Sequence, residues 1–474
     1  MRRGDALSIR SSALPRPVRP DGIRADDARL DGVRRNAIVQ HWRDLRWAPP
    51  VLVIAITGEM ALGGSNGWAT HPLAVLVNLL VAGSILAAVK PSSRVWVRTR
   101  TPLMLFSLAL LWAAVPRLLP AEWAMIAGVP ADPAPDRLMP ALADAISRVA
   151  LVLAACAATY QLKSERPWLW WLAVTGGAYA GWMIMTPLPW QFLAGVGQGR
   201  YAATIGNWNA AGTYFGITAT LCLTAMLARP APWRPGWPWL FAIPLAAALL
   251  LCMSTQSRSA FTLTAVALVV GLIWGHRSTM RPRRKRHAIM LALPLTLAIM
   301  TIAYVGADAL FPRYRALSAD SLSRWDIVTV YWNYALEEPL WGWGPGSFFE
   351  VNQARLTMAT APGFWSFGAA HNAPIQIALE AGLPALLLII AGAAAIARDV
   401  VWRPWGTQDI GLAGALAIAL GASLVDIAWN VPALGALSCV LVGILWGARP
   451  ARVPGTQLIR RNSTRRARGV PVTS

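Results

Sequence analysis

Long apolar segments recur along this chain, and they constrain its fold more than any other feature. Each segment holds about 17–24 residues, the length at which a helix crosses the hydrocarbon core of a bilayer. We therefore predict an all-α, polytopic membrane protein with about twelve transmembrane helices and one long external loop. The predicted spans are residues 49–64, 72–89, 101–119, 141–161, 168–186, 209–228, 236–253, 259–275, 288–306, 374–397, 408–425 and 428–447.

The composition favours a membrane protein over a soluble one. Of the 474 residues, 56% are hydrophobic and only 14% are charged, whereas a soluble domain carries about 25% charged residues. The net charge of +21 comes from Lys and Arg near both ends of the chain and in alternate connectors. That distribution is the positive-inside pattern, so we expect membrane lipids, and not nucleic acid, as the partner of these charges.

The same pattern predicts how the chain is divided. A basic, disordered cytoplasmic arm (1–47) precedes helices one to nine (48–306). A long external loop (307–373), helices ten to twelve (374–447) and a basic cytoplasmic tail (448–474) follow. The basic excess favours both ends of the chain inside and the long loop outside.

Two arginines on the predicted external side require an explanation. Arg258, in STQSRSAFTLTA, stands where an external turn enters the eighth predicted helix. A guanidinium grips phosphate oxygens in a fixed fork, so this position suits an anionic ligand, but an Arg that reaches lipid phosphate fits equally well. Arg324 opens a predicted surface helix (Arg324–Glu338) that Pro339 ends. Taken alone, Arg324 is more simply explained by solvation or by a pair with a nearby acid.

Two further motifs lie in or directly after the long loop. The glycine-rich stretch GWGPGSFF, which includes Gly344, could bind phosphate through backbone N–H groups or be only a turn. His371 and Asn372 stand directly before the tenth predicted helix, where a His could act as general base or have no role. Glu380 lies within that helix and needs a partner, either in a structural pair or in a site.

Asparagines mark the entrance of the sixth predicted helix. In TIGNWNAAGTY, Asn207 and Asn209 could cap the helix or donate hydrogen bonds to sugar hydroxyls, and capping is the better explanation for one of them. Arg200 belongs to the same external connector.

Other polar or reactive residues indicate structure rather than chemistry. Asp426 and Asn430 flank the turn between the last two predicted helices, and we interpret both as structural. The connector Leu119–Pro140 is rich in Pro and Asp, which predicts an irregular external loop. The four cysteines lie in apolar segments without metal-ligand spacing. We find no metal cluster, HExxH motif or Walker A loop, so we expect no metal and no cofactor.

Taken together, three stretches resemble the O-antigen ligase and O-antigen polymerase family of bacterial polysaccharide enzymes. They are GNWNAAGTY, SRSAFTL, and the pair RWDIVTVYWNYALEEPLWGWGPGSFF and AHNAPIQIALEAGLP. The last pair is the most specific, because it keeps an ordered Arg, Pro, Gly-rich turn, and His-Asn followed by Glu and Gly. The resemblance covers residues 200–385 at the level of motifs.

The resemblance implies an inverting, metal-independent glycosyltransferase of the bacterial inner membrane, with its active site facing the periplasm. Its donor would be an undecaprenyl-diphosphate-linked glycan, and its acceptor the lipid A core or another glycan. Arg258 and Arg324 would hold the diphosphate, and His371 would deprotonate or orient the acceptor hydroxyl. The further substrate-binding residues that we expect are Arg200, Asn207, Asn209, Gly344, Asn372 and Glu380.

Other functions remain open at this point. A ligase moves a finished glycan to lipid A core, a polymerase joins repeat units that are both on lipid carriers, and a third class transfers glycans to protein. A transporter would also suit about twelve helices with buried polar groups. The long external loop with its charged motifs, and the lack of an inverted repeat of broken helices, favour the enzyme.

Overall fold

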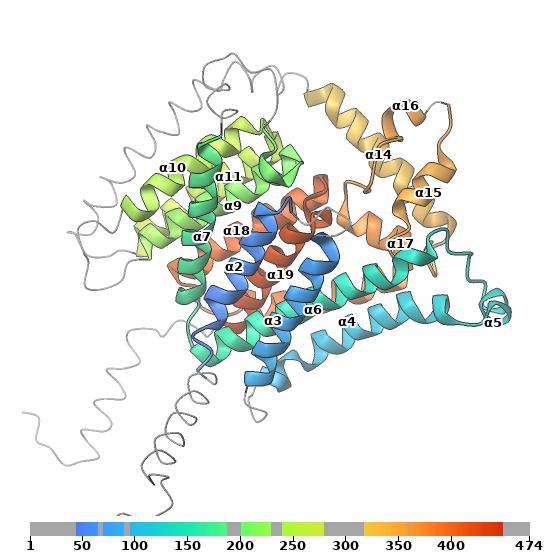
Figure 1. Ribbon diagram of the computed structural model, residues 1–474, viewed down its shortest axis with the longest axis horizontal. Helices are drawn as coiled ribbons and strands as arrows, with labels where there is room; N and C mark the ends of the chain where they lie inside the picture. Colours follow the sequence, from blue (N-terminus) through green and yellow to red (C-terminus); the bar gives the residue numbers. More distant parts are fainter. Residues whose placement is uncertain are drawn as a thin grey trace, which may run out of the picture. The chain divides into compact units, whose positions relative to one another are not determined.

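The predicted all-α fold is confirmed for the part of the chain that can be described. A computed structural model describes residues 44–64, 70–89, 95–186, 201–228, 239–278, 317–358 and 360–448, without the side chains of 239, 276–278 and 317–324. Every regular element within these ranges is a helix (Figure 1). The predicted span 288–306, the basic arm as far as residue 43 and the tail from residue 449 lie outside the described residues.

Each predicted span other than 288–306 overlaps a helix of the structure. These helices are α2 (Ala48–Ala61), α3 (Thr70–Ala88), α4 (Val95–Leu118), α6 (Leu138–Leu162), α7 (Arg166–Ile184), α9 (Trp208–Leu227), α10 (Trp239–Ser254), α11 (Arg258–Ser278), α17 (Ala373–Val401), α18 (Thr407–Val425) and α19 (Pro432–Gly447). Among the described residues, seven helices are long and apolar enough to cross a membrane: α3, α4, α6 with the turn before it, α9, α11, α17 and α18. A multi-span membrane protein is therefore supported, and the total of about twelve spans stays a prediction.

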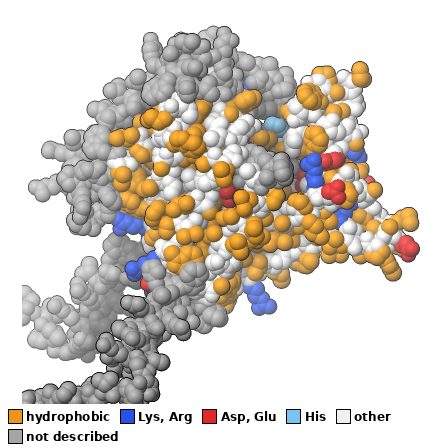
Figure 2. Space-filling view, viewed as in Figure 1, with side chains coloured by type: hydrophobic (Ala, Val, Ile, Leu, Met, Phe, Trp, Pro, Cys, Tyr) orange, Lys and Arg blue, Asp and Glu red, His pale blue; other side chains and the backbone are white. Residues whose placement is uncertain are grey.

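Helix α9 lies at the centre of one half of the bundle. Within its most apolar window, 94% of the residues are buried, and it packs against α7, α10, α11 and α18. Small residues permit this packing: a Cβ added to Gly212 would lie 2.6 Å from the Thr255 hydroxyl. In contrast, α3, α4 and α11 expose many large apolar side chains, and hydrophobic atoms cover much of the face in Figure 2. Such exposure is expected where lipid replaces water.

The predicted loops contain more helix than the sequence indicated. Connector Leu119–Pro140 contains α5 (Ala121–Ile126) and the 3₁₀ turn η1 (Pro135–Arg137), and α6 begins at Leu138. The described part of 307–373 forms α14 (Leu317–Glu337), α15 (Phe348–Arg355) and α16 (Ala361–Phe364). The predicted helix Arg324–Glu338 is thus confirmed and begins earlier than predicted. Helices α14 and α15 pack against α17 (Figure 1), and their position outside the membrane stays a prediction.

A second hydrophobic cluster fixes α14 and α15 to the start of α17. Its buried members include Tyr331, Phe348, Val351 and Ala370. The rings of Tyr331 and Phe348 lie 4.9 Å apart, and the Tyr331 hydroxyl donates to Asn352 Oδ1 at 3.0 Å. Ala370 directly precedes His371, so this cluster fixes the backbone on which His371 is carried.

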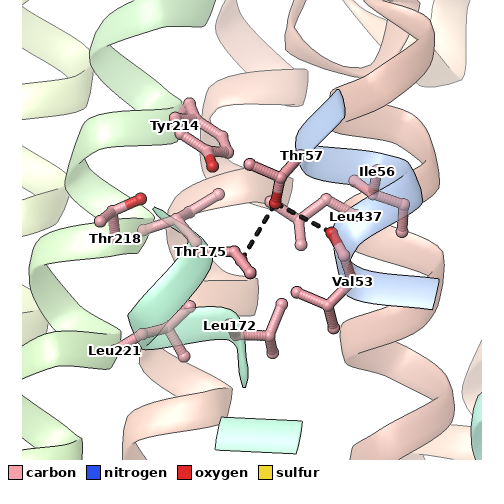
Figure 3. A pocket seen from close by; sticks show the side chains of 10 residues that line it. Val53, Ile56, Thr57, Leu172, Thr175, Tyr214, Thr218, Leu221 and Leu437 are labelled. Carbon is pink, nitrogen blue, oxygen red and sulfur yellow. Dashed lines mark hydrogen bonds between the residues drawn. The ribbon is translucent and has the colours of Figure 1, made fainter. Parts of the chain in front are cut away.

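A small cavity lies in the core among α2, α7, α9 and α19 (Figure 3). Apolar side chains form much of its wall, together with Thr57, Thr175, Thr218 and Tyr214. The Thr57 hydroxyl lies 2.9 Å from the Val53 carbonyl and 3.1 Å from the Thr175 hydroxyl. None of the predicted site residues lines it, so we assign it no part in the chemistry.

Candidate functional site

His371 occupies a constrained position at the entrance of α17. Its φ is +53°, a left-handed conformation that non-glycine residues rarely adopt. Its ring centroid lies 4.6 Å from that of Phe367, and its side chain is 29% exposed. An imidazole in this setting keeps access to solvent or substrate while its backbone is fixed.

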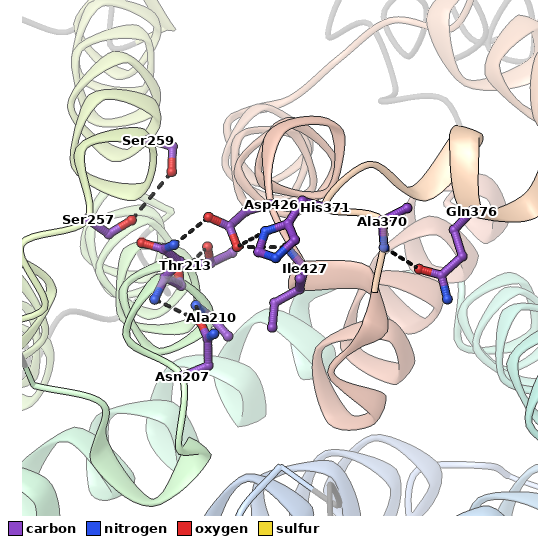
Figure 4. Close-up of polar contacts among 11 residues, drawn as sticks. Asn207, Ala210, Thr213, Ser257, Ser259, Ala370, His371, Gln376, Asp426 and Ile427 are labelled. Atoms are coloured by element: carbon purple, nitrogen blue, oxygen red, sulfur yellow. Dashed lines mark hydrogen bonds and ion pairs between the residues drawn. The ribbon is translucent and has the colours of Figure 1, made fainter. Parts of the chain in front are cut away.

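The partner of His371 is Asp426, which directly follows α18. His371 Nδ1 and Asp426 Oδ1 lie 3.6 Å apart, and Figure 4 shows the two side chains facing each other. The Asp426 side chain is only 3% exposed. Its Oδ1 accepts the Ile427 amide at 2.8 Å, and its Oδ2 accepts the side-chain amide of Asn209. A buried carboxylate is therefore fixed by two neutral donors and directed at an imidazole.

This arrangement can orient a general base. A carboxylate beside Nδ1 favours the tautomer with its proton on Nδ1, which leaves Nε2 free to accept a proton. The separation of 3.6 Å exceeds a hydrogen-bond length, and such contacts often shorten only when substrate binds. We interpreted Asp426 as structural from the sequence. A carboxylate at the end of an apolar helix was the available signal, but its partner could not be read from spacing.

The two asparagines of α9 have different roles. Asn207 is the N-cap, and its side-chain oxygen accepts the amides of Asn209 and Ala210 at 2.9 and 3.0 Å. Capping was predicted for one of the pair and is confirmed for Asn207. The Asn209 side chain donates to Asp426 instead, so the cap places a donor against the buried carboxylate.

Arg258 begins a helix that packs against α9, the helix that carries Asn209. It is the first residue of α11 and is half-buried. The preceding turn contains Gln256 at φ +52° and packs on α9, since a Cβ on Gly212 would meet Thr255, Ser257 and Ala260. Figure 4 shows Ser257 and Ser259 across from His371, with Asp426 between them. The turn before Arg258 therefore packs on the same end of α9 as Asn209 and contains a strained backbone position, as is common at functional sites.

The side chains of two arginines that we predicted in the site lie outside the described part of the structure. Arg200 lies outside the described residues. Arg324 lies within α14, two helical turns before the buried Tyr331, but its side chain is not described.

Gly344 and Glu380 have internal partners. The Gly344 amide donates to the Glu380 carbonyl at 2.9 Å, and the Trp343 amide donates to the Leu379 carbonyl at 2.8 Å. The Gly346 amide donates to the Glu380 carboxylate at 3.0 Å. These amides are therefore not available as the phosphate-binding nest that we considered, and the glycine-rich stretch acts as a turn.

A break in α17 explains why the glycine-rich turn donates hydrogen bonds to the carbonyls of Leu379 and Glu380. Gly382 has φ +81° inside the helix, and Pro384 has no N–H to donate to the Glu380 carbonyl. The Leu383 amide donates to the Pro339 carbonyl at 2.8 Å instead of to Leu379. Two helix carbonyls are left unsatisfied, and the amides of the glycine-rich turn satisfy them.

Asn372 fixes the helix that follows His371. Its side-chain oxygen accepts the Ile375 amide at 3.0 Å, which makes it the N-cap of α17. Its side-chain nitrogen donates to the Leu424 carbonyl at 2.8 Å. Both of its polar atoms are therefore engaged in positioning His371 beside the end of α18.

Comparison with known proteins finds a family match over part of this site. Residues 243–390 match the family model described as O-antigen ligase. Residues 243–390 are similar to the O-antigen ligase family. The family resemblance that the motifs indicated is thereby confirmed, and no curated protein matches the chain.

The matched range contains several residues and elements of the site that are distant from one another in sequence. It includes Arg258, α14, the glycine-rich turn, His371 and Glu380. Asn209 and Asp426 lie outside the matched residues, although both contact each other and Asp426 faces His371. Helices α9 and α18 therefore complete a site that the O-antigen ligase match covers only in part. Among the described residues, no group of three or more His, Cys, Asp and Glu side chains could hold a metal ion.

Proposed function

We propose that this protein is an O-antigen ligase-type membrane glycosyltransferase. It transfers a glycan from an undecaprenyl-diphosphate carrier to a hydroxyl acceptor at the periplasmic face of the bacterial inner membrane. The observation that carries the proposal is the His371–Asp426 pair, which Asn209 connects to the end of α9 on which the turn before Arg258 packs. Residues 243–390 of the same chain match the O-antigen ligase family model.

His371 acts as the general base in this proposal. Its Nε2 accepts the proton of the acceptor hydroxyl while that oxygen attacks the anomeric carbon of the donor sugar. Asp426 holds Nδ1 and stabilises the imidazolium that forms. General-base catalysis of this kind accelerates a reaction by about 10²–10⁴-fold.

The arginines act on the leaving group. As the new C–O bond forms, the bond between the anomeric carbon and the diphosphate oxygen breaks, and the diphosphate takes the electron pair. Arg258 and Arg324 stabilise the developing negative charge on its oxygens. Attack from the face opposite the diphosphate inverts the anomeric configuration, and two fixed guanidiniums make a divalent cation unnecessary. Arg200 and Asn209 are proposed to contact the substrate beside them.

The acceptor determines whether the protein is a ligase or a polymerase. The glycan profile of a strain that lacks the gene separates the two. Full-length polymer that remains on its lipid carrier indicates ligase activity, whereas single repeat units indicate a polymerase. An unchanged profile with substrate accumulating on one side of the membrane contradicts both, and fits a transporter.

A further inference from the structure

One face of α17 carries three polar residues spaced one helical turn apart, namely Asn372, Gln376 and Glu380. Polar side chains within an apolar helix need partners. Asn372 caps the helix and donates to Leu424. Glu380 accepts the Gly346 amide. Gln376 lies between them and connects more segments than either.

The side-chain oxygen of Gln376 accepts two hydrogen bonds. The backbone amide of Ala370, directly before His371, donates to it at 3.2 Å. The side-chain amide of Asn430 donates to it at 2.7 Å, and Asn430 belongs to the short turn that begins after Asp426. A single oxygen thus joins the backbone beside His371 to the turn beside Asp426.

Glu380 fixes which way the Gln376 amide points. The Gln376 nitrogen donates to Glu380 Oε1 at 3.0 Å, while Gly346 donates to Glu380 Oε2 at 3.0 Å. The Ala370 amide can only donate a hydrogen bond, and Glu380 Oε1 accepts one. The nitrogen of Gln376 must therefore face Glu380, and its oxygen must face Ala370 and Asn430.

We propose that Gln376 is a positioning residue for His371, and that Glu380 sets its orientation. Together they hold the His371 backbone and the Asp426 turn at the spacing that the base needs. This inference rests on the proposed function. It assigns Glu380 a role through Gln376 rather than in contact with the substrate.

An exchange of the amide and the carboxylate between positions 376 and 380 tests this proposal. Glu380→Gln places two side-chain amides together, and because Gly346 requires an acceptor, their nitrogens oppose each other. Gln376→Glu places two carboxylates together. The double variant Gln376→Glu with Glu380→Gln restores every hydrogen bond, since the carboxylate then accepts from Ala370, Asn430 and the new amide.

The assay uses purified protein with donor and acceptor lipids extracted from a strain that lacks the gene. For each single variant, and for Gln376→Ala, we expect kcat to fall about 10–100-fold at unchanged apparent KM, because sub-ångström to 1 Å displacements have effects of this size. The double variant recovers to within about 3-fold of the wild type, since it restores the hydrogen bonds. Gln353→Ala is the matched control, because Gln353 donates only to an exposed carbonyl of Trp365, and it keeps the wild-type kcat.

Two outcomes overturn the inference. One is a wild-type kcat for Gln376→Ala. The other is a double variant no more active than the single variants at equal protein level and thermal stability. His371→Ala separates this failure from failure of the proposed function: if His371→Ala is inactive and the exchange does not rescue, only the role of Gln376 is rejected. If His371→Ala is active, the proposed function itself is rejected.

Discussion

The side-chain nitrogen of Asn209 donates to the same carboxylate that faces His371. Asp426 Oδ2 accepts from Asn209, and Asp426 Oδ1 lies 3.6 Å from His371 Nδ1. Asn209 comes from the first turn of α9, Asp426 from the end of α18 and His371 from the entrance of α17. Three segments distant in sequence therefore converge on one buried carboxylate.

Asn209→Asp tests whether Asp426 needs a neutral hydrogen-bond donor beside it in order to orient His371. The variant places two carboxylates at hydrogen-bond distance, where like charges oppose each other by several kcal/mol. We expect the transfer rate to fall about 10-fold further than in Asn209→Ala, since an Asp426 carboxylate that is repelled by its new neighbour no longer orients the imidazole. Rates of purified variants measure the effect. Equal rates for the two variants would show that the charge of Asp426 does not matter.

Gly212→Ala tests the close contact between α9 and the Arg258 turn. The added Cβ would lie 2.6 Å from the Thr255 hydroxyl, so the turn must shift. We expect about a 10-fold lower transfer rate, because displacement of a charged group weakens its contact with the diphosphate. Gly181→Ala in α7 is the control, since a Cβ there meets nothing within 4 Å. Wild-type activity of Gly212→Ala would argue against a precise placement of Arg258.

Arg324→Lys tests how the leaving group is held. Lysine keeps the positive charge but lacks the fork that binds two phosphate oxygens together. If Arg324 grips the diphosphate in this way, the variant fails to restore surface glycan at normal protein level, as does Arg324→Ala. Complementation by the lysine variant alone would mean that charge suffices, and complementation by both would remove Arg324 from the site.

Tyr331→Phe tests what fixes the backbone before His371. The variant removes the hydrogen bond to Asn352 Oδ1 and leaves that oxygen buried, which destabilises the contact by about 1–2 kcal/mol. Faster amide hydrogen exchange in α14 and α15 than in the wild type would measure the loss, and unchanged exchange would contradict it.

The hydrogen bond between the Tyr331 hydroxyl and Asn352 Oδ1 contributes less to stability at high pH than at neutral pH. Burial raises the pKa of the Tyr331 hydroxyl above its ordinary value of 10.0. The folded protein therefore holds the phenol proton more tightly than the unfolded chain does. The contribution of Tyr331 is constant below about pH 10 and declines as the pH rises from there towards the raised pKa.

The sequence was sufficient for the apolar helices of the described residues, because long apolar segments leave few alternatives in a bilayer. It did not indicate the short helices α5, α15 and α16. It was not sufficient for the break in α17. Hydropathy is continuous across Gly382, and the interruption depends on which backbone amides replace the missing helical donors. Pro384 was the available signal, but the segment that satisfies the free carbonyls, Trp343 and Gly344, could be identified only from the fold.

The site was predictable for single residues and not for pairs. His371 and Asn207 stand at helix entrances, where local rules assign a base or a cap. Asp426 has no such local rule, because its role follows from the packing of α9 against α18 and from the cap at Asn372. Tertiary contacts therefore supplied the partner of the proposed base.

The most direct measurement is the release of undecaprenyl diphosphate from the lipid-linked glycan by purified protein in the presence of EDTA and acceptor lipid. We expect wild-type release to continue under EDTA, His371→Ala to show background release, and Asp426→Asn to be slower by about 10²-fold. Wild-type release by both variants, or a strict requirement for a divalent cation, would contradict the account.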